Sequence, residues 1–311
     1  MKVLIIGLGS IAQKHITAIK KLLPQSKIIA LRSNSNSQSF DHVENIYSLK
    51  ELDCLPDFCI ISTPTALHAE TIESVISLKI PLFIEKPPFS SIEDYSQILP
   101  KIEKYNIITY VAFNLRFHPV IQWLKANSIH IRALEVNIYC GSYLPDWRKN
   151  QDYSKSYSAK KHLGGGVHLD LIHELDYTIW LWGQPHYVHA QLAKLSDLHI
   201  ESADYAHYLL CYEDKYISIT LNYYRRDSKR QIEIVSANDT WVADLIDCNI
   251  KNNQGTILMQ HPSFNPITTY IDQMHYFIEC LKTNTPPMNN LKDSMPVLRA
   301  CLTPPLVSNN F

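Results

Sequence analysis

Residues 1–15 read MKVLIIGLGSIAQKH, and this is the most informative stretch of the chain. The apolar run Val3–Ile6 predicts a buried strand that leads directly into the pattern Gly7-x-Gly9-x-x-Ala12, after which a helical pattern begins. This is the dinucleotide-binding fingerprint with alanine in the third glycine position. Gly7 allows the tight turn, Gly9 lets the backbone approach a pyrophosphate, and Ala12 keeps helix and strand close. Because the N–H groups at a helix start attract phosphate, the stretch predicts a nucleotide site; the alternative is an ordinary strand–turn–helix.

From Met1 to about Phe117, short apolar runs alternate with amphipathic segments, which predicts a doubly wound parallel sheet, a Rossmann domain over residues 1–117. A Ser/Asn run, Ser33–Ser39, stands where a second helix would normally follow the second strand and predicts a mobile polar loop. The expected strands are Val3–Ile6, Lys27–Leu31, Phe58–Ser62, Leu82–Glu85 and Ile107–Phe113, and the expected helices are Ile11–Leu23, Ala66–Leu78 and Ile92–Tyr105.

After Phe117 the pattern changes to successive β-rich runs, several with two-residue alternation, which predicts an α+β domain with an open, mostly antiparallel sheet over residues 118–311. Glu213-Asp214-Lys215 predicts a hairpin turn. The expected strands are Ala133–Tyr139, Val188–Leu195, Ala206–Tyr212, Tyr216–Tyr223, Gln231–Val235 and Trp241–Leu245, and the expected helices are Val167–Trp182, Pro266–Lys282 and a last one near Leu291–Cys301.

The composition argues against several kinds of partner. The 29 basic and 30 acidic residues nearly cancel and form no basic run, which argues against a nucleic-acid or membrane partner. The N-terminal apolar run is too short for a signal peptide, and no run reaches a membrane-spanning length. The cysteines show no C-x-x-C pair and the histidines no ligand spacing, so we expect a reducing compartment and no metal. Together these features predict a cytoplasmic protein.

The end of the second expected strand bears on which cofactor is preferred. NAD-binding versions of this fold usually place an acidic residue there to hydrogen-bond the ribose 2′-hydroxyl, but here Arg32 and Ser33 take the place. Because an arginine can neutralise a 2′-phosphate, NADP is favoured slightly over NAD. The alternative is a solvated arginine on a loop.

Polar signatures follow the next two expected strands. Residues 62–68 read STPTALH, and Glu85-Lys86 is followed by two prolines. In an open parallel sheet, ligands bind beyond the carboxyl ends of the strands, so both segments should face the crevice. Lys86 could orient a substrate oxygen or exchange its proton, or it could belong to a solvated charge pair.

The segment GGGVHLDLIHELD, residues 164–176, predicts a helix that begins after three glycines. Asp170 and His173 are three residues apart and share a helical face, which Asp176 continues. A carboxylate beside a histidine raises the basicity of the imidazole, which suits a general base acting on a hydroxyl. A structural histidine is the alternative interpretation.

Between these segments lies a polar stretch rich in aromatic residues. Stacking rings and hydrogen-bonding groups together suit a sugar or a glycosyl phosphate, although such rings could also simply pack against the sheet. The candidate substrate contacts are Tyr143, Trp147, Arg148, Tyr153 and Tyr157.

Taken in order, GLGSIAQKH, STPTALH, IEKPP, AFNLRFHP and GGGVHLDLIHELD resemble the glucose–fructose oxidoreductase / inositol dehydrogenase / rhizopine-catabolism family, shortened to Gfo/Idh/MocA. The resemblance implies a Rossmann domain followed by an open-sheet domain that often forms the interface of a homo-oligomer, a dimer or tetramer. It also implies NAD(P)-dependent hydride transfer on a sugar, cyclitol or related polyol.

The resemblance also implies the positions of the cofactor contacts. The pyrophosphate would lie against the first turn, the adenosine ribose near the end of the second strand, and the nicotinamide side along the later loops. In that order these contacts are Gly7, Gly9, Ser10, Ile11 and Ala12, then Arg32 and Ser33, then Thr63, Pro64, His68, Glu85, Lys86, Asn114 and Arg116.

The implied catalytic set is Lys86, Asp170 and His173. His173 would take the hydroxyl proton, Lys86 would hold the reacting oxygen and Asp170 would orient the site. Many family members space the aspartate and histidine four apart rather than three, so a pairing through Glu174 or Asp176 stays open.

Three finer functions remain as alternatives. The stretch from Trp147 into GGGVHLDLIHELDY looks like a branch associated with bacterial surface glycans, whose substrates are nucleotide sugars or nonulosonic-acid precursors. A redox-assisted sugar lyase or glycosidase would retain its NAD and show no net change in it. A non-catalytic NAD(P)-binding sensor would keep its role without Lys86 or His173.

Overall fold

The computed structural model describes residues 1–34, 40–127, 131–148 and 151–304, and the chain divides into two compact units. The first unit is Met1–Asn114 with Asn265–Leu298, and the second is Leu115–Phe264 with Arg299–Phe311. The first boundary lies close to the expected one at Phe117, but the expected second domain ran on to the end of the chain. Most of the Ser33–Ser39 run falls outside the described residues.

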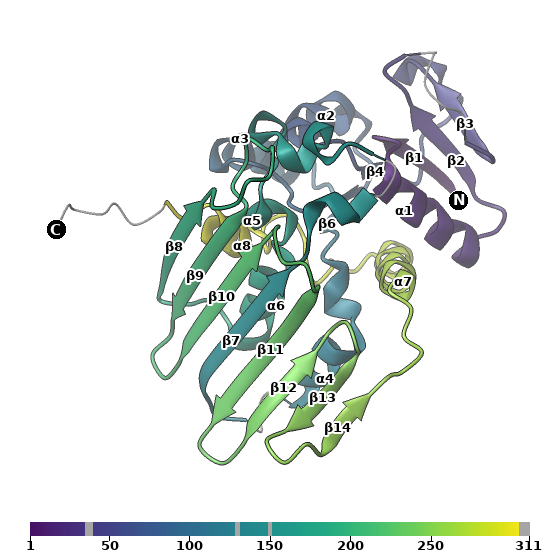
Figure 1. Cartoon of the computed structure of the whole chain (residues 1–311). Coiled ribbons are helices and arrows are strands. Elements are labelled where there is room, and N and C mark those ends of the chain that lie inside the picture. The colour runs from purple at the N-terminus through teal and green to yellow at the C-terminus, as the bar shows by residue number, and fades with distance from the viewer. Residues whose placement is uncertain (35–39, 128–130, 149–150, 305–311) are drawn as a thin grey trace. The chain divides into compact units, whose positions relative to one another are not determined.

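The sheet of the first unit is parallel throughout, in the order β3-β2-β1-β4-β5-β6 (Figure 1). This is the strand order of dinucleotide-binding domains, so the predicted Rossmann fold is confirmed. The edge strand β3 was not predicted, because its sequence VENI is short and only half buried. The strands are β1 Lys2–Ile6, β2 Lys27–Leu31, β3 Val43–Ile46, β4 Phe58–Ile61, β5 Leu82–Ile84 and β6 Thr109–Val111.

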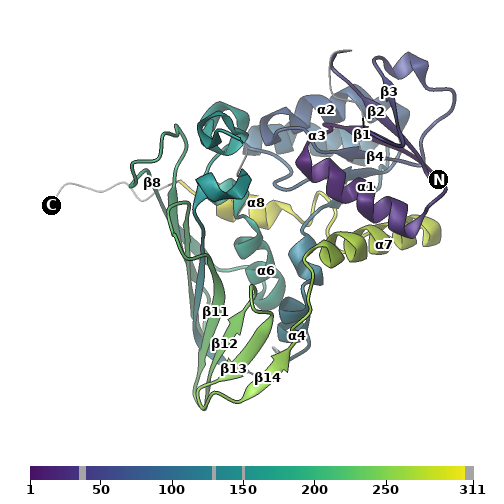
Figure 2. The same ribbon diagram turned by 45° about the vertical axis from the view of Figure 1, so that its right-hand side comes forward.

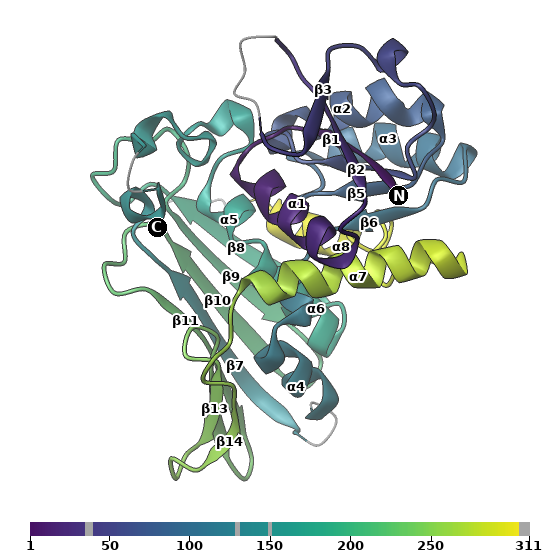
Figure 3. The ribbon, with the colours of Figure 1, turned by 90° about the vertical axis from the view of Figure 1, so that its right-hand side faces the viewer.

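Helices lie on both faces of this sheet (Figures 2 and 3). On one face α1 (Ser10–Leu22) packs beside α7 (Ile267–Thr283), and on the other are α2 (His68–Val75) and α3 (Ile92–Lys104). The ring of Phe277 contacts Phe58 at 5.3 Å and Phe83 at 5.4 Å between centroids. Because α7 completes this apolar core, residues 265–298 belong to the first unit. The sequence pattern had assigned them to the second domain.

The second unit holds a sheet of eight strands in the order β14-β13-β12-β11-β7-β10-β9-β8. All neighbours are antiparallel except β7 and β10, so the predicted open, mostly antiparallel sheet is confirmed. The predicted turn at Glu213-Asp214-Lys215 joins β9 to β10, with Cys211 opposite Tyr216. The strands are β7 Ala133–Gly141, β8 Tyr187–Ala193, β9 Tyr205–Cys211, β10 Tyr216–Asn222, β11 Lys229–Ser236, β12 Thr240–Asp244, β13 Asn249–Asn252 and β14 Ile257–Gln260.

The parallel pair places two loops at the same end of this sheet, beyond the last residues of the central strands β7 and β10. Gly141 at the end of β7 lies opposite Asn222 at the end of β10. The loops that follow remain joined, because the Leu144 amide donates to the Tyr223 carbonyl at 2.8 Å. The loops at this end of the sheet carry most of the aromatic residues that the sequence pattern predicts as substrate contacts.

The helix predicted over Val167–Trp182 is two helices, α5 (Val167–Asp170) and α6 (His173–Trp182). Leu171 leaves the helical region with φ −101° and ψ 31°, so Asp170 and His173 do not lie on one continuous helix. The last helix is α8 (Met295–Cys301), shorter than expected, and α4 (Pro119–Asn127) was not predicted. Among the described residues, no helix combines the length and apolarity needed to cross a membrane.

Candidate functional site

The first turn of the first unit leaves open space in front of an uncapped helix start. Gly9 precedes α1 with open space where a Cβ would stand, since no atom lies within 4 Å of that position. No side chain caps the helix start, and its first turn carries no acidic residue. Ser10 and Ile11 begin this turn, while Ala12 is fully buried in the core, as the fingerprint predicts. An anion could therefore approach the uncapped N–H groups.

Arg32 lies just after β2, where its amide donates to the Ile46 carbonyl at 2.8 Å. Its Nη1 is buried and meets no hydrogen-bond partner among the residues that the structure describes. A buried guanidinium N–H that lacks an acceptor is suited to an anionic group such as a 2′-phosphate. Ser33 follows as an exposed residue.

The loops after β4 and β5 are joined by His68, whose side chain is 1% exposed. Its Nε2 lies 2.9 Å from the Thr63 carbonyl oxygen and its Nδ1 lies 3.0 Å from the Pro88 carbonyl oxygen. Burial lowers the pKa of His68, and the contacts with these carbonyls oppose that shift. Because both ring nitrogens face backbone oxygens, the imidazole holds the two loops together. Thr63, Pro64 and His68 as cofactor contacts stay a prediction.

Glu85 and Lys86 follow β5 directly. The Glu85 carboxylate is 6% exposed; its Oε1 lies 2.6 Å from Nε2 of His15, and its Oε2 accepts the Lys86 amide at 3.1 Å. Burial raises the pKa of Glu85, but the His15 hydrogen bond and the charge of Lys86 outweigh it, so the pKa lies below its usual range. His15 received no role from the sequence pattern, although it ends the opening stretch MKVLIIGLGSIAQKH.

The predicted contacts Asn114 and Arg116 fall in different units. Asn114 donates from Nδ2 to the Thr269 hydroxyl of α7 at 2.6 Å within the first unit. In the second unit, Arg116 binds the Asp176 carboxylate through Nε at 3.0 Å and Nη2 at 2.6 Å, with both side chains buried. Asp176 is therefore paired with Arg116, and Arg116 as a cofactor contact stays a prediction.

In the second unit, the buried carboxylate of Asp170 accepts hydrogen bonds from two tyrosines. One is Tyr157, at 2.6 Å, from the predicted aromatic stretch, and the other is Tyr223, just after β10. Burial and the neighbouring Asp170 charge raise the pKa of both hydroxyls well above its usual range, so they remain donors. His173 begins α6 and is 8% exposed.

Residues of the aromatic stretch lie around this carboxylate, at the end of the sheet where β7 and β10 stop. The Trp147 ring meets Tyr223 edge-on at 5.3 Å, and the Arg148 guanidinium lies 5.7 Å from the Tyr157 ring centre. Tyr143 stacks under Arg226 at 3.6 Å. Tyr153 accepts the His199 amide at 3.3 Å through its hydroxyl and lines a small cavity together with Trp147 and Arg148. Tyr223 and Arg226 were missed because their sequence resembles an ordinary strand end.

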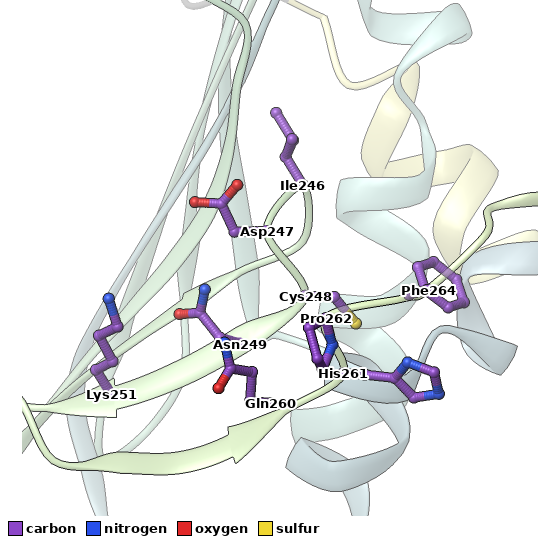
Figure 4. A pocket seen from close by; sticks show the side chains of 9 residues that line it. All are labelled: Ile246, Asp247, Cys248, Asn249, Lys251, Gln260, His261, Pro262 and Phe264. Atoms are coloured by element: carbon purple, nitrogen blue, oxygen red, sulfur yellow. The ribbon is translucent and has the colours of Figure 1, made fainter.

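A pocket of about 460 Å³ lies elsewhere in the second unit, beside the start of β13 and the end of β14, and Figure 4 shows the side chains that line it. Its polar side chains do not converge, because Asp247 and Lys251 point to one side and His261 to the other. Convergent polar groups mark ligand sites, so this pocket is a weaker candidate than the residues around Asp170. Within the described ranges, no group of three or more His, Cys, Asp or Glu side chains could hold a metal ion.

Comparisons with known proteins match both parts of the chain. Residues 1–113 match an oxidoreductase family with an NAD-binding Rossmann fold, and residues 132–241 match the GFO/IDH/MocA C-terminal domain. The uncharacterized oxidoreductase YrbE of Bacillus subtilis is 30% identical over 129 residues, 39% of this chain and 38% of that protein. The rhizopine catabolism protein MocA of Rhizobium meliloti is 26% identical over 188 residues, 58% of this chain and 56% of that protein. The matches thus span only about four- to six-tenths of these relatives.

Among solved structures, the WlbA dehydrogenase from Bordetella pertussis, in complex with NADH and UDP-GlcNAcA, superposes with a TM-score of 0.79. The match covers 96% of this chain and 94% of that one at 17% identity, which supports the fold alone.

Proposed function

The chain belongs to the Gfo/Idh/MocA family of oxidoreductases, and from that premise we propose that it transfers a hydride between a nicotinamide cofactor and a hydroxyl or keto carbon of a sugar or sugar derivative. The observation that carries this proposal is the open position at Gly9 in front of an uncapped helix. A phosphate-bearing cofactor fits this place, and the nicotinamide, when bound, would accept or supply the hydride.

The proposed roles of the side chains follow from their positions. His173, at the first position of α6, would take or return the hydroxyl proton. Lys86, beside the buried Glu85, would hold the reacting oxygen. Asp170 would orient the substrate, because two tyrosine hydroxyls already hold its carboxylate in place.

We expect His173→Ala to lower turnover by about 10²–10⁴-fold, because a positioned proton acceptor contributes that much to a rate. The cofactor dissociation constant should stay unchanged, since the residue lies in the second unit and the phosphate cradle in the first. Steady-state kinetics and cofactor titration of the same preparation separate these effects. An unchanged kcat would remove His173 from the mechanism.

We further propose that NADP is preferred over NAD. The support is the buried Nη1 of Arg32, which meets no acceptor in the described part of the chain, and the absence of an acidic residue at the end of β2. The test is a titration of purified, cofactor-free protein with NADPH and NADH, followed by intrinsic fluorescence. We expect Arg32→Ala to weaken NADPH by about tenfold or more while NADH changes little. Equal losses would show that Arg32 does not contact the 2′-phosphate.

For the substrate we propose a charged sugar derivative, such as a nucleotide sugar or a nonulosonate precursor. Near Asp170, Arg148 lies over the Tyr157 ring and Arg226 lies over the Tyr143 ring. This arrangement supports an anionic ligand beside a stacking surface. The WlbA dehydrogenase, solved with UDP-GlcNAcA, is of the same fold. Turnover of charged sugar derivatives with no turnover of free neutral sugars or inositols is the expected result.

We also propose that the protein forms a dimer or tetramer through the open face of the second sheet. Tyr187 on β8 and Tyr216 on β10 both lie opposite Cys211 of β9, the strand between them, and are 71% and 58% exposed. Exposed rings on one sheet face are typical of a protein interface. Light scattering on the parent and on Tyr187→Glu/Tyr216→Glu tests this, with a monomeric variant as the expected result.

A further inference from the structure

A buried histidine links α1 to the segment that follows β5. His15 lies in the middle of α1, is fully buried, and places Nε2 2.6 Å from Oε1 of Glu85. The other oxygen of the same carboxylate, Oε2, accepts the backbone amide of Lys86 at 3.1 Å. The Glu85 carboxylate thus connects α1 to Lys86, the next residue along the chain.

The geometry also assigns the proton on the imidazole. Nδ1 of His15 is buried and finds no hydrogen-bond partner among the described residues, so a proton there would be an unsatisfied buried donor. The proton therefore belongs on Nε2, where it is donated to Glu85. The ring itself is fixed by edge contacts with Phe83 of β5 at 5.0 Å and Tyr270 of α7 at 5.8 Å.

From this arrangement we propose that His15 is a positioning residue for Lys86. It holds the Glu85 carboxylate ionised and in place, and that carboxylate in turn fixes the backbone at Lys86. His15 is six residues, about 9 Å, along the helix that begins after Gly9. The helix α1 would therefore fix both the cofactor phosphates at its start and, through Glu85, the position of Lys86. The role of this link in catalysis rests on the proposed function.

Other ionisable groups also act on the Glu85 carboxylate. They are Lys14 on α1, Lys86 itself and His68 on α2, with Tyr270 of α7 packed against the His15 ring. Burial alone raises the pKa of Glu85, and the His15 hydrogen bond is the largest influence that lowers it. Removal of His15 should therefore let the carboxyl group take up a proton at a higher pH.

The test compares His15→Leu, which removes the hydrogen bond, with His15→Gln, whose amide can donate from nearly the same place as Nε2. The full chain, labelled with ¹³C at glutamate carboxyl groups, is titrated by NMR, and Glu85→Gln identifies the signal. We expect the Glu85 midpoint in His15→Leu to move up by about one to three pH units and to stay near the parent value in His15→Gln. Equal midpoints in the parent and His15→Leu would overturn the proposal.

Amide hydrogen exchange tests the second link. We expect the Lys86 amide to exchange about tenfold faster in His15→Leu, because it loses its bond to a charged acceptor. The Val111 amide, which donates to Asn289 at 2.8 Å in the same unit, serves as the control for global stability. Equal acceleration of both amides would mean that His15 only stabilises the fold, and the proposal fails.

Neither measurement requires substrate or cofactor. If the protein binds no cofactor, the proposed function fails while the His15–Glu85–Lys86 link can still be found. If cofactor binds normally and the two readouts do not move, only the link fails.

Discussion

At the scale of single residues, the two glycines of the first turn are required for different physical reasons. Gly7 has φ +93°, and a Cβ there would lie 2.3 Å from the Thr63 amide nitrogen. Gly9 has open space at the same position. The first glycine therefore allows the turn to pack against the loop after β4, and the second leaves room for a ligand.

This difference predicts opposite outcomes for two substitutions. Gly7→Ala should destabilise the first unit by about 1–3 kcal/mol, because it combines a left-handed backbone with a steric clash. Gly9→Val should leave the melting temperature nearly unchanged but weaken cofactor binding at least about tenfold, because its side chain fills the phosphate position. Calorimetry and cofactor titration of both variants check this. A strongly destabilised Gly9→Val or a cofactor-binding Gly9→Val contradicts the interpretation.

At the scale of elements, α6 is fixed by acidic residues that are paired with arginines from other segments. Asp176 binds Arg116, and Glu174, which is fully buried, binds Nε of Arg230 on β11 at 2.6 Å. Both acids lie within the first turn and a half of the helix, immediately after His173. The ion pairs therefore set the direction in which α6 begins, and with it the place of the proposed base.

Breaking one buried pair should be costly, whereas replacing both partners should not. We expect Arg116→Met to lower the free energy of unfolding by about 3–5 kcal/mol, because Asp176 is left charged and buried, and we expect Arg116→Met/Asp176→Leu to recover most of it. Glu279→Gln, which breaks an exposed pair with Lys282 on α7, is the control and should cost less than about 1 kcal/mol. Urea unfolding measures all of these values, and a double variant no better than the single would refute the expectation.

Local patterns predicted most elements, and long-range contacts account for what was missed. β1, the glycine turn and α1 depend on adjacent residues, so their sequence was sufficient. The break at Leu171 was not predictable, because apolar residues continue at helical spacing through it. Within the site, His15 and Glu85 are 70 residues apart and Tyr223 and Asp170 are 53 apart, so no local spacing connects them. The helix α7 was expected, but its amphipathic pattern does not say which sheet it covers.

At the scale of the whole molecule, the second unit should lose stability in acid. His118 is 3% exposed; its Nδ1 accepts the Val120 amide and its Nε2 donates to the Leu245 carbonyl, an arrangement that only the neutral ring allows. Burial lowers the pKa of His118 to about 4 from 6.5. The unfolded chain therefore takes up the proton first as the pH falls, so the stabilisation is complete above about pH 6.5 and is lost toward pH 4.

For this single group, the loss over that window should reach about 3 kcal/mol. His118→Gln keeps a donor toward Leu245 but cannot titrate, so its unfolding free energy should fall less steeply with acid. His168, whose pKa burial also lowers to about 4, remains in both proteins and contributes with the same sign. Urea unfolding between about pH 7 and pH 4 compares the slopes, and identical slopes would exclude His118 as a source.

The position of α7 has a consequence for how the protein is made. Residues leave the ribosome in order, so Phe58 and Phe83 of the first sheet emerge long before Phe277, which covers them. At about 5–20 residues per second, the interval is on the order of ten seconds or more. All of Leu115–Phe264 is synthesised within it. The unit that begins first in the chain therefore keeps one apolar face of its sheet uncovered until α7 is made, after nearly all of the second unit.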